Sequence, residues 1–194
     1  MKRSTLRLFV VLFLVTFPAT ASAVRLGALG KDNKLSGPFA AFELHGSLLS
    51  DASNLSMTAG SFGYGIRGGY RWAGWGVFGL VEHNMWLAPN LINEKVVMGA
   101  VNIGVGAELT YAGGFLHTSL AVGPSVLAFD TILDKAGTTG FFMHLRPVGL
   151  RFVVHKYLVL ILDPISFALI APVLSGIPLI YTQYRTSFSI EGAF

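Results

Sequence analysis

The chain has 194 residues, of which 53% are hydrophobic and only 12% are charged, about half the charged fraction of a soluble domain. Three of its 14 basic residues lie at positions 2, 3 and 7, so the rest of the chain carries 11 basic against 10 acidic residues and is nearly neutral. This balance argues against nucleic-acid binding, and the absence of cysteine excludes disulfides, thiolate metal ligands and a lipid-modified cysteine.

The N-terminus has the layout of a secretory signal peptide. Residues 1–7 carry three basic side chains, residues 8–17 are apolar, and Ala21-Ser22-Ala23 matches a small-residue cleavage site. The apolar run is too short to span a bilayer, which takes about 20 residues. We therefore expect residues 1–23 to be a cleaved signal peptide, 24–38 a short periplasmic segment, and 39–194 the folded domain.

From Phe39 onward, apolar and polar residues alternate in six runs, at about 39–48, 61–72, 75–86, 96–111, 115–123 and 140–152. Successive side chains of a strand point to opposite faces, so each run predicts a strand with one apolar and one polar face. The third run is weaker, because Phe78 and Leu80 share a face with polar residues. In the sixth run the phase shifts near Pro147, which predicts a bulge that turns Arg151 to the polar face.

Residues 157–170 form a nearly continuous apolar run that competes with a transmembrane helix as an interpretation. Asp163 near the centre of such a helix would cost roughly 2.5–3.5 kcal/mol. Three prolines, at positions 164, 172 and 178, would also interrupt it. We therefore expect a seventh strand from Tyr157 to about Phe167.

The last fifteen residues, 180–194, alternate without a break between apolar or small residues and polar ones, and an aromatic residue closes the chain. This pattern resembles the C-terminal strand of bacterial outer-membrane β-barrels. In that family the final Phe and the alternating residues are read by the membrane's insertion machinery. The resemblance implies an insertion signal made of Tyr184, Phe188, Ile190 and Phe194.

Short and long connections alternate along the chain. The short ones are 73–74, 112–114 and 154–156, and the long ones are 51–60, 87–95, 124–139 and about 168–179. Alternation places short turns at one end of a closed sheet and long loops at the other, as in outer-membrane barrels with periplasmic turns. The predicted fold is therefore all-β, an eight-stranded antiparallel up-and-down transmembrane β-barrel. The whole mature chain resembles the small eight-stranded outer-membrane proteins, which implies the outer membrane of a Gram-negative bacterium.

Aromatic residues predict two bands at the two membrane interfaces. One band lies beside the short turns and the C-terminus and comprises Tyr70, Trp72, Trp75, Tyr111, Phe115, Tyr157 and Phe194. The other lies near the long loops and comprises Phe62, Tyr64, Trp86, Phe141 and Tyr184.

The polar faces predict a lumen filled by a polar network. Its expected members are Glu43, His45, Arg67, Arg71, Glu82, Asn102, Glu108, His144, Arg146, Arg185 and Glu191, with Arg151 and Asp163 added if the phases hold there. The charged members are five arginines and five carboxylates. An eight-stranded barrel is just wide enough for side chains to fill it, and balanced charge indicates ion pairs. An open ion-selective pore more often carries a ring of one sign.

Two motifs suggest chemistry. Gly63–Gly68 matches the dinucleotide pattern G-x-G-x-x-G, but no helix follows, so these glycines are expected to make room inside the barrel. His117-Thr118-Ser119 resembles the His-x-Ser pair of a family of outer-membrane lipid-modifying enzymes. The family's pair looks outward near the external leaflet, whereas this pair is expected to face the lumen near the periplasmic turn. An interior hydrogen-bonding histidine is therefore favoured over a catalytic one.

A metal site of His45 and His144 with Glu43 or Glu108 is conceivable, but no local pair has a recognisable ligand spacing, so no metal or cofactor is predicted. The favoured function is a non-enzymatic outer-membrane barrel with a structural or surface-interaction role. The alternatives are a lipopolysaccharide deacylase or acyltransferase and a narrow channel for small solutes. Expected partners are outer-membrane lipids, the insertion machinery and an unidentified external ligand at the loops, with no nucleic acid.

Overall fold

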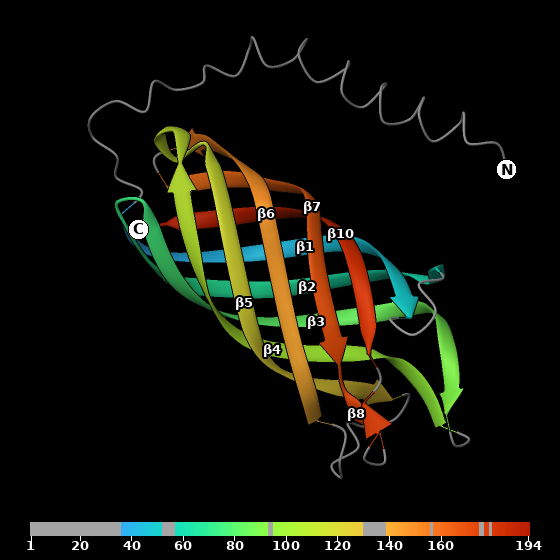
Figure 1. Ribbon diagram of the computed structural model, residues 1–194. Coiled ribbons are helices and arrows are strands. Elements are labelled where there is room, and N and C mark those ends of the chain that lie inside the picture. Colours follow the sequence, from blue (N-terminus) through green and yellow to red (C-terminus); the bar gives the residue numbers. More distant parts are fainter. Residues whose placement is uncertain are drawn as a thin grey trace, which may run out of the picture. The chain divides into compact units, whose positions relative to one another are not determined.

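The computed structural model describes residues 36–51, 57–92, 95–129, 139–155, 157–174, 177–178 and 180–194. They form a closed barrel of eight antiparallel strands (Figure 1). The barrel strands are β1 (Gly37–Asp51), β2 (Met57–Trp72), β3 (Trp75–Ile92), β4 (Lys95–Tyr111), β5 (Leu116–Phe129), β6 (Thr139–His155), β7 (Leu158–Ala171) and β10 (Tyr181–Ala193). A 3-10 turn, η1 (Ala112–Gly114), joins β4 to β5, and the short strands β8 (Val173–Leu174) and β9 (Ile177–Pro178) pair between β7 and β10.

Each barrel strand pairs with its neighbours in the chain, and the last strand pairs with the first. The β1–β10 register runs unbroken from Phe39–Ala193 to Asp51–Tyr181. Closure leaves no strand edge unpaired, which a sheet in hydrocarbon requires because no water can satisfy free backbone groups there. The structure confirms the predicted eight-stranded antiparallel up-and-down barrel.

One end of the barrel, called here the turn end, holds the three short connections and both ends of the described chain. Gly37 pairs with Arg71 there, Trp72 pairs with Trp75 across the first turn, and the Phe194 amide donates to the Pro38 carbonyl at 3.0 Å. The opposite end is called the loop end. The expected alternation of short and long connections therefore segregates to the two ends.

The strands extend further toward the loop end than the sequence predicts. β3 reaches Ile92, β5 reaches Phe129 and β7 reaches Ala171, although these stretches were expected to be loop. In β3 the alternation is lost, yet pairing with β4 resumes after a register shift between Met85 and Asn90. The expected loops were thus too long, because a shifted ladder keeps its hydrogen bonds while its side-chain pattern changes phase.

Bulges occur where the sequence places prolines. The β6–β7 register shifts on both sides of Val148, next to Pro147, and Arg151 lies inside the barrel, as predicted. The segment at 158–171 is a strand, so the helical interpretation is wrong. Among the described residues, no helix is both long and apolar enough to cross a membrane.

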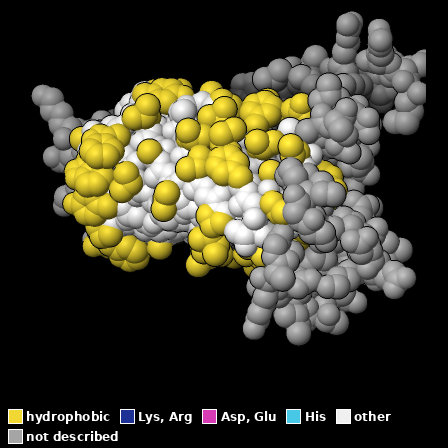
Figure 2. All heavy atoms as spheres, turned by 60° about the horizontal axis from the view of Figure 1, so that its bottom comes forward, with side chains coloured by type: hydrophobic (Ala, Val, Ile, Leu, Met, Phe, Trp, Pro, Cys, Tyr) yellow, Lys and Arg dark blue, Asp and Glu magenta, His cyan; other side chains and the backbone are white. Residues whose placement is uncertain are grey.

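The two faces of the sheet differ sharply in chemistry. Every Asp, Glu, Lys and Arg whose side chain the structure describes is buried inside the barrel. Large hydrophobic side chains cover the outward face, and no charged side chain is visible among them on the face in Figure 2. The alternation of the sequence is therefore a sorting of charge inward and hydrocarbon outward.

The interior also contains an apolar cluster. Its members are Phe39, Phe78, Leu80, Ala100, Ala121, Phe142, Ala168 and Ile170. Trp86, which was expected in the outer aromatic band, is also inside and only 4% exposed, with its ring 5.1 Å from that of Tyr181. The expectation for Trp86 was wrong because β3 keeps one phase from Phe78 to Trp86, which points this whole series inward.

Candidate functional site: the polar interior and the apolar belt

The predicted lumen residues lie inside the barrel, and each of the following is 4% exposed or less: Glu43, His45, Arg67, Arg71, Glu82, Asn102, Glu108, His144, Arg146, Arg185 and Glu191. Arg151 and Asp163 lie there too. The structure adds Asn84, Gln183 and Ser187, whose only signal in the sequence is their place on a polar face. The charged side chains gather in two clusters at different heights.

The first cluster lies toward the turn end and is called the turn-end cluster: Arg67, Arg71, Arg151, Glu108 and Glu191. Arg71 donates to both oxygens of Glu191, at 2.9 and 3.0 Å, and through Nε to Glu108. Arg151 donates to Glu191 at 2.7 Å. This fork geometry matches the strongest carboxylate–arginine pairing and holds three strands together.

Arg67 differs from its two neighbours in this cluster. Its nitrogens lie 4.0 Å from Glu108 and 3.7 Å from Glu191, and none of them makes a hydrogen bond within the described residues. Its guanidinium lies 5.8 Å from the centre of the Phe78 ring. Three arginines facing two carboxylates give the turn-end cluster a net charge of +1.

The second cluster is called the mid-barrel cluster and contains Glu43, His45, Glu82, Asn84, Asn102, His144, Arg146 and Arg185. Arg146 donates to both oxygens of Glu43, at 2.9 and 2.7 Å. Arg185 donates to Glu82 Oε2 at 3.0 Å and lies 2.9 Å from Oε1. Residues 103 apart in the chain are thereby joined across the lumen.

His117 and Ser119, the weak catalytic candidates, point into the lumen and are 0% and 3% exposed. His117 Nε2 lies 3.0 Å from Asp163, which also accepts from Ser187 at 3.0 Å and lies 3.5 Å from Arg146. A lipid chain outside the barrel cannot reach these atoms. The arrangement packs the interior and does not present a nucleophile to the membrane.

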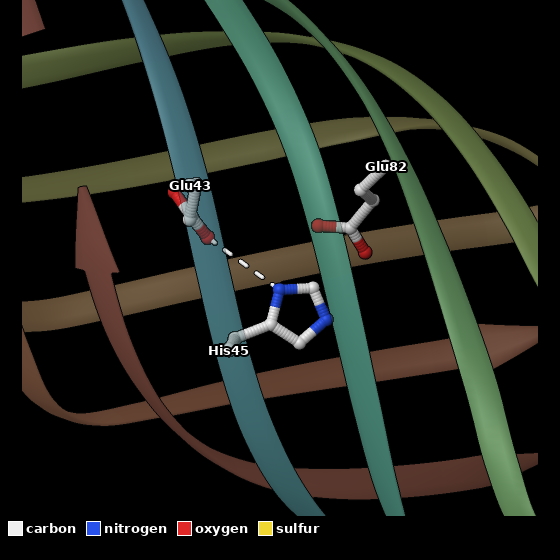
Figure 3. Close-up of side chains that lie close together, drawn as sticks. All are labelled: Glu43, His45 and Glu82. Atoms are coloured by element: carbon white, nitrogen blue, oxygen red, sulfur yellow. Dashed lines mark ion pairs between the residues drawn. The ribbon is translucent and has the colours of Figure 1, made fainter. Parts of the chain in front are cut away.

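Three residues of the mid-barrel cluster could hold a metal ion. Glu43, His45 and Glu82 each offer one ligand atom, and these atoms lie within 4.8 Å of one another (Figure 3). Glu108, the other carboxylate considered from the sequence, lies in the turn-end cluster instead. The sequence signal for this trio is a Glu and a His two residues apart on one face of β1.

The outward face carries an apolar belt with aromatic residues at the turn end. Tyr70, Trp72, Trp75, Tyr111 and Tyr157 are between 40% and 52% exposed. The Trp72 and Trp75 rings stack at 4.3 Å across the turn. The residues of the expected insertion signal, Tyr184, Phe188, Ile190 and Phe194, also lie outward and are 42–75% exposed.

A closed meander of eight strands, apolar outside and polar inside, is the architecture of the small eight-stranded outer-membrane β-barrels. Neisserial surface protein A has this fold: it is 13% identical, the match covers 82% of this chain and 98% of that one, and the TM-score is 0.61. Ail, the attachment invasion locus protein of Yersinia pestis, is 13% identical over 82% of this chain and 99% of its own, with a TM-score of 0.47. OprG from Pseudomonas aeruginosa is 10% identical over 82% and 96%, with a TM-score of 0.41. No protein-family model and no curated protein matches the sequence.

Proposed function

We propose that this protein is an integral barrel of the bacterial outer membrane, with a lumen closed by its own side chains and a structural or surface-interaction role. The observation that carries the proposal is the sorting of charge. All ten charged side chains that the structure describes lie inside, while the outside is covered by hydrophobic groups. In water this arrangement would expose a large apolar surface and bury ions, both of which are unfavourable; in a bilayer both are expected.

The filled lumen supports a non-conducting barrel over a channel. Each charged lumen side chain is 4% exposed or less, so water-sized access to it is nearly absent. In an open pore the same side chains would line a wetted wall and be exposed. The five arginines and five carboxylates also neutralise one another and leave no ring of one sign.

No observation favours the lipid-modifying alternative. Its candidate residues, His117 and Ser119, are enclosed by the barrel wall, and Asp163 occupies the imidazole's free side. An acyl-transfer or hydrolysis site must place its nucleophile within reach of the substrate carbonyl.

The proposed topology has both ends of the barrel chain and the short turns in the periplasm, after export by the signal peptide at residues 1–23. Partners are then the surrounding lipids, the insertion machinery that reads the strand ending at Phe194, and an external ligand at the loop end. The signal peptide and most residues of the outer connections lie outside the described ranges. At the loop end, β8 and β9 present a short two-stranded sheet to that side.

Two measurements test the proposal together. Cells expressing the full chain are fractionated, and the protein is expected in the outer-membrane fraction, beginning at Val24 by N-terminal sequencing. The purified barrel is then reconstituted in planar bilayers, where we expect no conductance steps. Recovery in the periplasmic fraction without detergent would refute the membrane role, and steady conductance would refute the closed lumen.

A further inference from the structure

Four side chains of the mid-barrel cluster converge with unused lone pairs: Glu43, His45, Glu82 and His144. We propose that they form an interior binding site for one divalent transition-metal ion, for which Zn²⁺ is the best-matched candidate. The inference rests on the barrel interior and goes beyond the membrane role proposed above.

Glycines in β2 allow these side chains to meet. Glu43 on β1 and Glu82 on β3 are both registered opposite Gly65 on β2. His45 and Asn84 are likewise both registered opposite Gly63, and a Cβ at Gly63 would overlap the His45 ring. Two missing side chains on the intervening strand thus open the space in which β1 and β3 make contact.

The hydrogen bonds of His45 fix its protonation pattern. Its Nε2 lies 2.7 Å from Asn84 Oδ1, and the orientation of the Asn84 amide is set because its Nδ2 donates to Glu82 while its oxygen accepts from Arg185. Nε2 must therefore carry the proton and donate to that oxygen. In the neutral imidazole, Nδ1 is left with a free lone pair.

His144 follows the same logic. Its Nε2 lies 3.1 Å from Ser166 Oγ, and the Ser166 hydroxyl hydrogen is directed to the Arg185 carbonyl. Nε2 of His144 is therefore the donor to Ser166, and its Nδ1 also holds a lone pair. Neither Nδ1 has a hydrogen-bond partner among the described residues, and both side chains are 2% exposed or less.

Both lone pairs face carboxylate oxygens. His45 Nδ1 lies 3.8 Å from Glu43 Oε1, as Figure 3 shows, and His144 Nδ1 lies 3.9 Å from Glu82 Oε2. Each of these oxygens accepts one hydrogen bond, from Arg146 and Arg185 respectively, and so retains a further acceptor site. Lone pairs that face one another in a buried space repel unless a cation lies between them.

The charge of this half of the lumen also calls for a cation. Glu43, Glu82 and the nearby Asp163 carry three negative charges against two positive charges on Arg146 and Arg185. The turn-end cluster has the opposite imbalance. A bound divalent ion would change the net charge here from −1 to +1, so the magnitude of the buried charge would not grow.

The donor set selects the kind of ion. Two imidazole nitrogens and two carboxylate oxygens suit Zn²⁺, with bonds of about 2.0–2.2 Å, and ligand atoms about 3.3 Å apart in a tetrahedron. The observed separations of 3.8 and 3.9 Å require only a small inward shift. Asn84 and Ser166 hold the far nitrogens of the two imidazoles, as partners of metal-bound histidines commonly do.

The test uses the full barrel without an affinity tag, refolded in detergent with Zn²⁺ and then passed through metal-free buffer. We expect about one zinc per chain by mass spectrometry of the metal, and two imidazole ligands by X-ray absorption at the zinc edge. The variants His45→Gln and His144→Gln should each retain at least tenfold less zinc. His117→Gln, another buried lumen histidine, is the matched control and should retain the wild-type amount.

Folding of each variant is checked by its heat-dependent mobility on a gel. The X-ray absorption measurement needs no variant, so a variant that does not fold leaves the test intact. Less than a tenth of a zinc per folded wild-type chain would overturn the proposal. So would nitrogen NMR that shows His45 and His144 fully protonated after refolding with zinc, because a proton would then occupy each space instead.

Discussion

Arg67 and Arg71 lie four residues apart on the same face of β2 and in the same buried cluster, yet the structure predicts different consequences when each is replaced by Met. Arg71 makes three hydrogen bonds to Glu108 and Glu191, whereas Arg67 makes none within the described residues. A hydrogen bond to a charged group contributes about 1.5–3 kcal/mol. The loss of Arg71 would leave Glu108 without this donor and Glu191 with only Arg151 as a close one.

We expect Arg71→Met to lower the free energy of unfolding by about 3–5 kcal/mol, the range for breaking one partner of a buried pair. Arg67→Met should change it by less than about 1 kcal/mol in either direction, because a desolvated charge without hydrogen bonds contributes little. Its contact with Phe78 adds only about 0.5–1 kcal/mol. Removal of Arg67 also brings the cluster from +1 to neutral.

The assay is urea unfolding of the barrel in lipid vesicles, followed by tryptophan fluorescence from Trp72 and Trp75. Arg71→Lys is the matched control: it keeps the charge but not the planar fork, so an intermediate loss is expected. Equal losses for Arg67→Met and Arg71→Met would refute the view that hydrogen-bond geometry, and not charge alone, makes these pairs stabilising.

Three further predictions concern the wall and the end of the barrel. Gly63→Ala should cost about 1–3 kcal/mol by forcing a Cβ into the His45 ring, while Gly46→Ala, an outward site with no atom within 4 Å, should be nearly neutral in the same unfolding assay. Val105→Arg, at a side chain 69% exposed in the belt, should cost about 2–4 kcal/mol in vesicles, and Val105→Thr much less. Deletion of Phe194 should reduce the assembled fraction in cells several-fold, yet leave refolding in detergent unchanged; an equal defect in both would assign Phe194 a purely structural role.

Period-two patterning was sufficient to predict the strands, the closed barrel and which charged residues face inward, because one face must meet lipid and the other must not. The phase shift at Pro147 was also visible, since proline cannot take part in a ladder. Trp86 was misplaced because a hydrophobic residue was assumed to face outward, although the phase of β3 already pointed it inward. The strand ends were missed where register shifts interrupt the pattern.

The partners inside the lumen could not be predicted. Glu43 and Arg146 are 103 residues apart, and their meeting depends on the stagger of strands around the whole barrel. Local spacing carries no information on that stagger. For the same reason, Glu43, His45 and Glu82 did not stand out as a group in the sequence, while the tertiary structure brings them within a few ångströms.

The pairing of β1 with β10 means that the seam of the cylinder joins the earliest and the latest strands to be exported. The Arg71–Glu191 bonds, which link residues 120 apart, can form only once that seam has zipped. Until then the charges destined for the lumen remain hydrated and the hydrocarbon-facing groups have no bilayer around them. Assembly is thus an all-or-none, post-translational event, and a chain shortened at its carboxyl end would leave two open edges instead of a smaller barrel.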